Sequence, residues 1–250
     1  MNRVIYILIQ ICFLFFLPSC ATTSLQNIKE NQLCEAYEKD SIALLNNFFN
    51  NWANEIKPIS NNEILKLSDT LKIVYKVYEN FTHNRLIKYR NVYNTTKYCM
   101  VQNEIEFRIS NENLLLNPIL PSEIVYSKIL LNFRPVINDL GSQIVYVNHL
   151  YASVLRSFIK SKCGGKTNSK YSGDPWNCWP RANFLSKVVS LRASLMGFHF
   201  HTLPEISLTF NKSLNEVIIS ACFGSMWTEE LYVLSKDGWK FKESFSTTIE

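Results

Sequence analysis

The chain has 250 residues, of which 47% are hydrophobic and 13% aromatic, and its formal net charge is +5. This length suits one large domain or two small ones, with enough apolar surface to bury a core. The basic residues are scattered, with no arginine-rich face and no interleaved basic and aromatic run, so the composition argues against a nucleic-acid-binding protein.

The first twenty residues have the features of a secretory signal peptide. A cationic tip at Arg3 precedes an apolar segment from Val4 to Leu17 that only Gln10 interrupts. A tip and a segment of this kind, with a small residue before a cut site, are typical of secreted proteins. As a helix the segment spans ~21 Å, which is short for a hydrocarbon core about 30 Å thick. The sequence therefore predicts that residues 1–19 are a signal peptide that is removed.

The end of this segment, Leu17-Pro18-Ser19-Cys20, resembles the lipobox of bacterial lipoproteins. The resemblance implies that Cys20 receives a diacylglyceryl group and becomes the first residue of the mature protein, with three acyl chains such as palmitate in all. Several chains hold a protein firmly on a membrane, whereas one holds it only marginally. The resemblance further implies a bacterial envelope location. Ala21, in place of aspartate, resembles lipoproteins sent to the outer membrane rather than kept at the inner one.

Two other interpretations of the N-terminus stay open. An ordinary secretory signal cut near Ala21 would release a soluble protein, and an uncleaved segment would remain as a helical anchor. The polar stretch of residues 20–40 predicts a tether between the anchor and the folded body.

Seven cysteines are present, and five remain if Cys12 leaves with the signal and Cys20 carries lipid. Five is an odd number, so at least one thiol stays free. Cys163 and Cys178 flank a loop rich in glycine, serine, asparagine and lysine, and we expect them to form a disulfide in an oxidising periplasm. Closing a loop of that length stabilises a fold by ~3 kcal/mol in the chain-entropy relation. The chain has no C-x-x-C pair, which argues against a zinc site.

Apolar periodicity predicts two helices after the tether. Ser41 is a good N-cap for a first helix with an aromatic face, which Pro58 ends. Asn61 or Asn62 can cap a second helix, whose apolar residues recur every three or four positions as far as Phe81.

The next part of the chain has the pattern of short strands. Residues 84–96 are mixed in character and predict a loop. The runs 97–101 and 104–109 predict a hairpin about the two polar residues between them, with one wet face and one buried face. Residues 124–133 are strongly apolar and fit either a helix or a strand, whereas residues 143–147 predict a strand.

Two more helices are predicted on either side of a loop over residues 161–179. Before the loop, Asn148 can cap a helix that reaches Ile159. After it, Trp179-Pro180 places proline in the first turn of a helix whose apolar stripe runs to Leu195.

The remainder of the chain has four strand-like runs. They are Ile206–Phe210, Val217–Phe223, Glu230–Leu234 and Trp239–Phe245. Their short links predict an antiparallel meander with one core face, against which the preceding helix can pack. We therefore expect an α+β fold with helices packed on an antiparallel sheet, divided into an N-terminal region over residues 41–160 and a C-terminal helix plus meander over residues 180–250.

The helix and meander resemble the cone-shaped fold of the nuclear transport factor 2-like proteins. The residues that carry this resemblance are 184–195, 216–223, 229–234 and 238–249. The longer pattern also resembles uncharacterised lipoproteins of Bacteroidetes-type envelopes. The first resemblance implies a cone-shaped pocket, in a superfamily that includes enzymes and binding modules alike. It transfers no catalytic signature to this chain.

Phe198-His199-Phe200-His201 is the arrangement that most suggests a chemical site. In an extended backbone, residues two apart point to the same side, so both imidazoles can face one pocket with Glu205 close behind. Two histidines and a carboxylate can hold a metal, or a histidine can act as a base near neutral pH. Surface or hydrogen-bonded structural histidines are the other interpretation, since the spacing matches no metalloprotease motif. We treat His199, His201 and Glu205 as weak pocket candidates and predict no metal and no cofactor.

The sequence also lacks a G-x-S-x-G nucleophile elbow, a phosphate-binding loop and a dinucleotide fingerprint. We therefore expect a lipid-anchored binding or structural module of a bacterial envelope, whose partner is an envelope protein or a small ligand. A hydrolase or isomerase-like enzyme that uses His199 or His201 in a pocket is the alternative hypothesis.

Overall fold

The structure is a computed structural model, and it describes most of the chain after the N-terminal segment. The described residues are 25–93, 96–115, 123–138, 140–160, 178–194, 197–200, 202–223 and 226–249. The predicted signal peptide, Cys20, Cys163 and His201 lie outside these ranges. Within them, none of the helices combines the length and the apolar character that a membrane span requires.

Two compact units make up the chain, and they interleave along the sequence. One unit comprises Met1–Asn50 and His149–Lys187, and the other comprises Asn51–Asn148 and Val188–Glu250. We call them the helical unit and the sheet unit. Each unit contains residues from both of the predicted regions, 41–160 and 180–250.

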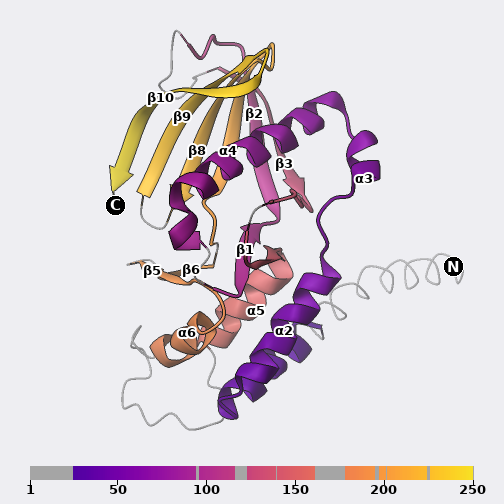
Figure 1. The fold of residues 1–250 in the computed structure, drawn as a ribbon, viewed down its shortest axis with the longest axis vertical. Coiled ribbons are helices and arrows are strands. Elements are labelled where there is room, and N and C mark those ends of the chain that lie inside the picture. Colours follow the sequence, from indigo (N-terminus) through magenta and orange to yellow (C-terminus); the bar gives the residue numbers. More distant parts are fainter. Residues whose placement is uncertain are drawn as a thin grey trace, which may run out of the picture. The chain divides into compact units, whose positions relative to one another are not determined.

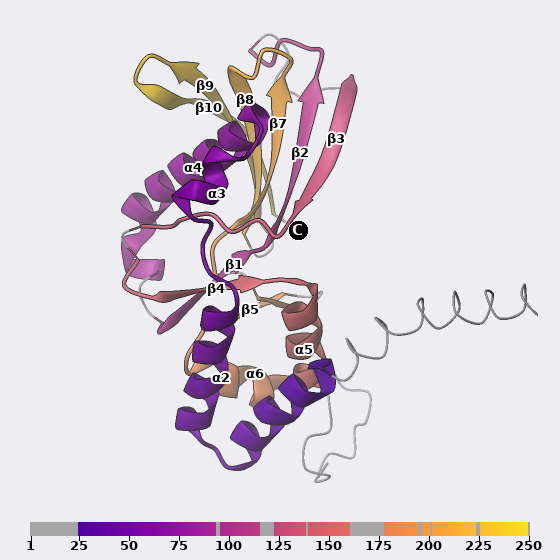
Figure 2. The same cartoon turned by 90° about the vertical axis from the view of Figure 1, so that its right-hand side faces the viewer.

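The helical unit is a bundle of helices (Figure 2). Its described helices are residues 25–38, the first part of α2 (Ile42–Glu55), α5 (His149–Lys160) and α6 (Trp179–Ser186). The hydroxyl of Ser41 accepts a hydrogen bond from the Leu44 N–H at 3.3 Å, and α2 ends before Pro58, as predicted. The predicted helix at α5 is also confirmed.

The helix over residues 25–38 falls in the stretch that we expected to be a tether. Leu33 is fully buried, and the ring of Tyr37 packs edge-on against Phe158 and Phe184, with centroids 6.0 and 5.5 Å away. Leu33, Ala36 and Tyr37 are three and four positions apart, so they lie on the side of the helix that packs into the unit. This stretch is therefore part of the folded body from residue 25 onward.

α6 begins with proline in its first turn, as predicted, but it is shorter than predicted. It ends at Ser186, and the residues expected to form its last turns include strand β5 (Arg192–Ser194). Just after the helix, the C=O of Val188 accepts a hydrogen bond from the Tyr98 N–H at 3.1 Å, and Val189 bridges Tyr98 in parallel. Two β-branched residues with a strand partner end the helix, because that partner satisfies their backbone better than another turn would.

The sheet unit is built on a six-stranded sheet in the order β10-β9-β8-β7-β2-β3 (Figure 1). Its strands are β2 (Glu104–Ser110), β3 (Ile124–Leu131), β7 (Glu205–Asn211), β8 (Glu216–Phe223), β9 (Met226–Ser235) and β10 (Gly238–Ile249). Neighbouring strands are antiparallel except β2 and β7, which are parallel. The fold class is α+β, as predicted, and the predicted meander is confirmed as β7 to β10.

α4 (Asp69–Tyr93) lies across one face of this sheet (Figures 1 and 2). One core cluster joins them: Val74, Tyr75, Val77, Tyr78 and Phe81 from the helix, with Ile105, Phe107, Ile206, Leu208, Phe210, Val217, Ile219, Ala221, Tyr232 and Trp239 from the strands. The helical residues recur at three and four positions and the strand residues alternate, which is how each element presents one apolar face. We predicted that the helix preceding the meander would cover it, and α4 does so instead.

The predicted second helix is divided in two. A short helix, α3 (Asn61–Leu65), precedes α4, and its N-cap is Ser60 rather than either of the asparagines that follow. Ser60 and Glu63 form a capping box, in which each side chain accepts a hydrogen bond from the other residue's backbone N–H. The hydroxyl of Ser68 accepts a second such bond at the start of α4. Serine side chains compete with the helix for backbone donors, so they start new helices here.

α4 also continues to Tyr93, through residues for which we predicted a loop. Arg85 ties this extension to the sheet, with Nη2 2.5 Å from Glu230 Oε1 on β9. The guanidinium carbon of Arg85 also lies 5.1 Å from the ring centroid of Phe81. The ion pair is largely buried, with side chains 19% and 14% exposed. Because its partner strand lies far away in the sequence, the residues near Arg85 do not predict this contact.

The predicted hairpin of β1 (Tyr98–Gln102) and β2 is not formed. β1 instead pairs in parallel with β4 (Gln143–Val147) in a separate two-stranded sheet. The side chain of Gln102 explains the difference: its Nε2 donates to the Ile206 C=O at 3.0 Å, and its Oε1 accepts from the Ile206 N–H at 2.6 Å. The amide of Gln102 thus pairs with the backbone of β7 as a neighbouring strand would. The chain then passes at Asn103 from the two-stranded sheet to the six-stranded sheet.

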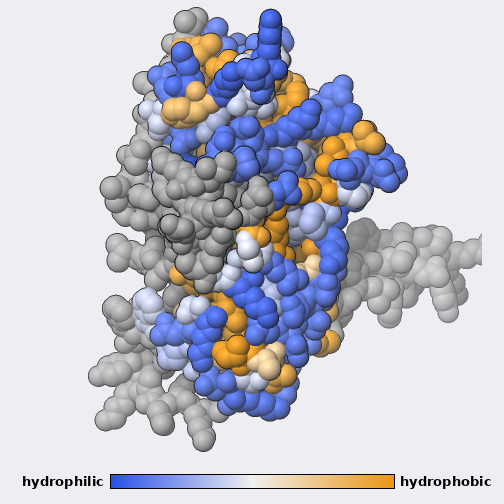
Figure 3. All heavy atoms as spheres, viewed as in Figure 1, coloured by the Kyte–Doolittle hydropathy of each residue, from blue (hydrophilic) through white to orange (hydrophobic). Residues whose placement is uncertain are grey.

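β3 is the edge strand of the described sheet next to β2. Its exposed large apolar residues are Ile124, Val125, Tyr126, Ile129 and Leu131. An apolar edge of this kind is a template for unwanted pairing, and the exposed Lys128 in the middle of the strand opposes it. On the face drawn in Figure 3, hydrophobic residues form separate patches in a mainly hydrophilic surface.

Replacing Gln102 by alanine should leave the N–H and C=O of Ile206 without their partner in the core. Each unpaired buried group costs ~1–3 kcal/mol, so we expect Gln102→Ala to lower the free energy of unfolding by roughly 2–4 kcal/mol. Urea unfolding followed by circular dichroism measures this loss. Gln143→Ala, at an exposed glutamine of β4, is the control, and equal losses in the two variants would contradict the role of Gln102.

Candidate functional site

A pocket of about 400 Å³ lies in the sheet unit between α4 and the segment that follows β3. Its lining is Lys76, Glu79, Asn80, Thr82 and His83 from the helix, with Val136, Ile137 and Asn138 from the segment. Lys76, Glu79 and His83 are three and four positions apart, so they share one face of α4. None of the residues that the sequence suggested for a site belongs to this lining.

The wall opposite α4 is a segment without regular secondary structure that is held by hydrogen bonds. Phe133 and Asn103 form a pair: the Phe133 N–H donates to the Asn103 C=O at 2.7 Å, and Asn103 Nδ2 donates to the Phe133 C=O at 2.9 Å. The Tyr146 hydroxyl donates to the Pro135 C=O at 2.5 Å. Because these partners are buried, they fix the course of the segment just before it reaches the pocket.

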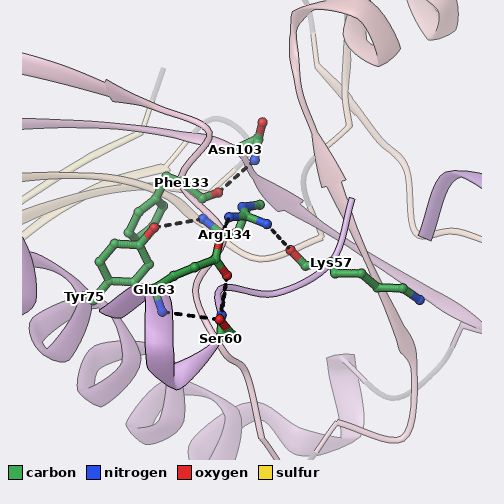
Figure 4. A network of polar contacts seen from close by, with 7 residues as sticks. All are labelled: Lys57, Ser60, Glu63, Tyr75, Asn103, Phe133 and Arg134. Atoms are coloured by element: carbon green, nitrogen blue, oxygen red, sulfur yellow. Dashed lines mark hydrogen bonds and ion pairs between the residues drawn. The ribbon is translucent and has the colours of Figure 1, made fainter. Parts of the chain in front are cut away.

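Arg134 adds a second set of contacts to the same wall (Figure 4). Its Nη1 donates to the Lys57 C=O at 3.1 Å and its Nη2 to Glu63 Oε1 at 2.7 Å. Its backbone N–H donates to the Tyr75 hydroxyl at 3.3 Å, and its C=O accepts from the Ile59 N–H at 2.8 Å. Four residues therefore hold Arg134, and contacts within the protein fix this part of the wall.

The Glu63 carboxylate has a strongly lowered pKa. The hydrogen bond from the Ser60 N–H is the largest cause and the bond from Arg134 the next, and together with weaker effects they bring the pKa of Glu63 to about 2. A lowered pKa stabilises the fold at every pH above the ordinary value of 4.5. That contribution is lost only as the pH falls through about 2, so this contact is intact at neutral pH.

Glu79 is the pocket residue whose surroundings change its chemistry most. Its carboxyl is half-buried, and its Oε1 accepts a hydrogen bond from the Val136 N–H at 3.3 Å. Burial raises the pKa of Glu79, and the bond from Val136 lowers it only in part. A ligand that offers a positive charge or a hydrogen-bond donor would offset the cost of burying this carboxylate.

The rest of the lining surrounds Glu79 with polar groups. Lys76 and His83 are exposed, and they lie on the same helix face about one turn before and after Glu79. Thr82 supplies the one hydroxyl of the eight lining residues, and it donates to the Tyr78 C=O, so it is turned toward its own helix. This arrangement offers both hydrogen-bond donors and acceptors to a small polar molecule.

The histidine site suggested by the sequence receives no support from the described residues. His199 ends β6 (Gly197–His199), where the backbone is extended and pairs with Arg192 of β5. His201 lies outside the described residues, and Glu205 is exposed at the start of β7. No three His, Cys, Asp or Glu side chains in the described ranges come together as a metal site would require.

The predicted disulfide between Cys163 and Cys178 is not formed, because Cys178 carries a free thiol. Cys34 is disulfide-bonded. Cys34 belongs to the packed helix over residues 25–38, in the stretch that we expected to be a tether, and Cys163 lies outside the described residues.

Comparisons with known proteins leave the site to be interpreted from its own geometry. No protein-family model matches the sequence, and neither a curated protein nor a solved structure matches it. Sequence reasoning missed the pocket because Lys76, Glu79 and His83 have the spacing of an ordinary solvated helix face. The available signal was the apolar pair Val136 and Ile137 after a proline, but nothing in the sequence places that pair beside α4.

Replacing Glu79 by glutamine removes the half-buried charge and keeps an oxygen for the Val136 N–H. Because the pKa of Glu79 is raised in the fold, its ionisation destabilises the protein as the pH rises from the ordinary value of 4.5 through the folded value. We expect Glu79→Gln to raise the unfolding temperature at about pH 7 and to have little effect at about pH 4.

Thermal unfolding followed by circular dichroism at both pH values measures this difference. Glu243→Gln, at an exposed carboxylate on β10, is the control and should change little at either pH. A stabilisation by Glu79→Gln that is equal at the two pH values would contradict burial of the charge as its cause.

Proposed function

We propose that this chain is a lipid-anchored protein of a bacterial envelope that binds a small polar ligand in the pocket beside α4. The observation that carries the binding role is the pocket wall held by Arg134, Asn103 and Tyr146 independently of any ligand. A wall that is ordered in advance lowers the entropy cost of binding. No comparable arrangement of described side chains favours the enzyme hypothesis.

The lipobox-like residues Leu17-Pro18-Ser19-Cys20 support the anchor, and Ala21 supports the outer membrane as its destination. Lipidation at Cys20 would attach the protein to a membrane although no described helix spans one. The resemblance to the nuclear transport factor 2-like proteins also stays a proposal. The helix laid across the meander supports it, whereas the parallel contact of β7 with β2 is a feature that the resemblance does not imply.

The chemistry of the lining indicates the class of ligand. A volume of about 400 Å³ is within the range of small-molecule pockets. The half-buried Glu79 favours an amine or a hydroxyl donor, and the neighbouring Lys76 and Asn138 can bind acceptor atoms of the same molecule. We therefore propose a ligand such as an amino sugar or an amino alcohol rather than an apolar compound.

The anchor is tested by replacing Cys20 with serine in a bacterial host. We expect Cys20→Ser to leave the membrane fraction, since serine cannot take the acyl groups, and the mass of the N-terminal peptide should show no lipid. Cys178→Ser, which changes a free thiol at the residue before α6, should remain in the membrane fraction. A Cys20→Ser protein that is still processed and membrane-bound would rule out the lipid anchor.

The pocket is tested with glucosamine, ethanolamine and glycerol as probes, measured by isothermal titration and by the rise in unfolding temperature. We expect the amines to bind better than glycerol, and Glu79→Gln to weaken their binding roughly ten-fold through loss of a charged hydrogen bond. Glu243→Gln should bind as the parent protein does. The absence of any binding, or amine binding that is unchanged in Glu79→Gln, would contradict the proposed ligand site.

A further inference from the structure

Two large apolar side chains are exposed on the first described turn of the helical unit. In the helix over residues 25–38, Leu25 is 44% exposed and Ile28 is 53% exposed. They are three positions apart, so they lie next to each other on the helix surface. A single exposed apolar residue is ordinary on a protein surface. An adjacent exposed pair that lies only a few residues after the predicted lipid attachment more often marks a contact surface.

Polar contacts within the helical unit hold this turn firmly. The ammonium of Lys29 donates to the Tyr151 hydroxyl at 2.8 Å and lies 4.7 Å from the centroid of the same ring. The Ser157 hydroxyl donates to Glu30 Oε2 at 2.6 Å. Both contacts join the helix to α5 directly after Ile28, so the exposed pair occupies a fixed position on the bundle.

The pair is also close to Cys20 along the chain. An extended chain covers at most ~3.6 Å per residue, so the Cα atoms of Cys20 and Leu25 lie within ~18 Å of each other in any conformation. An acylated Cys20 places its backbone in the headgroup layer, which is about 5–8 Å thick on each side of the hydrocarbon core. The Cα atom of Leu25 is therefore always within ~18 Å of the residue that lies in that layer, and Ile28 follows it by about one helical turn.

We infer that the first turn of this helix, with Leu25 and Ile28, inserts into the interface of the bilayer that carries the lipid anchor. The inference rests on the lipidation proposed above. The two side chains would enter the boundary between the headgroups and the acyl chains of a phospholipid bilayer. Two side chains are too few to hold a free protein on a membrane. Attachment through Cys20 makes their contact intramolecular, so its effective concentration is high enough to orient the helical unit.

The contact is apolar rather than electrostatic. The helix over residues 25–38 carries one lysine and three glutamates, so it is not attracted to anionic headgroups. Its lysine, Lys29, is only 6% exposed, and its ammonium is directed at Tyr151. The insertion should therefore be insensitive to salt, unlike the membrane contact of a basic helix.

Site-specific photocrosslinking in isolated bacterial membranes tests this inference. p-Benzoylphenylalanine replaces Ile28 in one full-length protein and Leu65 in another. Leu65, on α3, is 71% exposed and lies far from Cys20 in the sequence, so it is a matched apolar position. After irradiation, mass spectrometry of the peptides distinguishes lipid adducts from protein adducts, and the N-terminal peptide reports whether Cys20 is acylated.

We expect the probe at position 28 to give at least about ten-fold more lipid adduct than the probe at position 65, at both low and high salt. An acylated Cys20 with no excess of lipid adduct at position 28 would overturn the inference and leave the anchor standing. Adducts at position 28 to another copy of the chain or to a second protein would also overturn it. An unacylated Cys20 would overturn both the anchor and the insertion.

Discussion

Residues 133–136 have no regular secondary structure, and the pocket exists because of how their backbone is held. An irregular segment must find partners for its N–H and C=O groups outside any helix or strand. Here they come from Asn103, Tyr146, Tyr75, Glu79 and the backbone of Ile59, which belong to different parts of the sheet unit. The Arg134 side chain then closes the arrangement onto Lys57 and Glu63. One of these partners, Glu79, also faces the pocket, so the wall and the binding chemistry share a residue.

Two carboxylates next to this segment have opposite roles because their surroundings differ. Glu63 accepts hydrogen bonds from Ser60 and Arg134, and these contacts hold its pKa at about 2. It is therefore a permanent anion that fastens α3 to the segment. Glu79 has one backbone donor and is half-buried, and burial raises its pKa. A half-buried carboxyl with a raised pKa is stabilised in its charged form when a hydrogen-bond donor or a cation contacts it, which is the property expected of a ligand contact. The two glutamates thus differ in chemistry because of their surroundings, since the residue type is the same.

The sequence predicts those parts of the fold that depend on neighbours in the chain. The limits of α2, the helix at α5 and the meander β7–β10 follow from periodicity and turn residues within short windows. Most of the failures involve a distant partner, although the division of the second helix comes from the local caps at Ser60 and Ser68. Gln102 looks like a turn residue until its amide is seen on Ile206, 104 residues away. α4 continues past a polar stretch because Arg85 meets Glu230, 145 residues away. The pocket could not be predicted for the same reason, since its two walls become neighbours only after α4 and residues 133–138 have packed.

The order of the chain separates the pocket from the helix that follows Cys20. The chain leaves the helical unit at residue 50, builds α4, β2, β3 and the pocket wall, and returns at residue 149. Every residue that lines the pocket lies between those two positions, so the site is made by one continuous stretch of the sheet unit. The helix that follows Cys20 belongs to the other unit, where Lys29 and Glu30 join it to α5. Glu79 therefore belongs to one unit, whereas Leu25 and Ile28 belong to the other, so the proposed ligand site and the proposed membrane contact can be tested with separate variants.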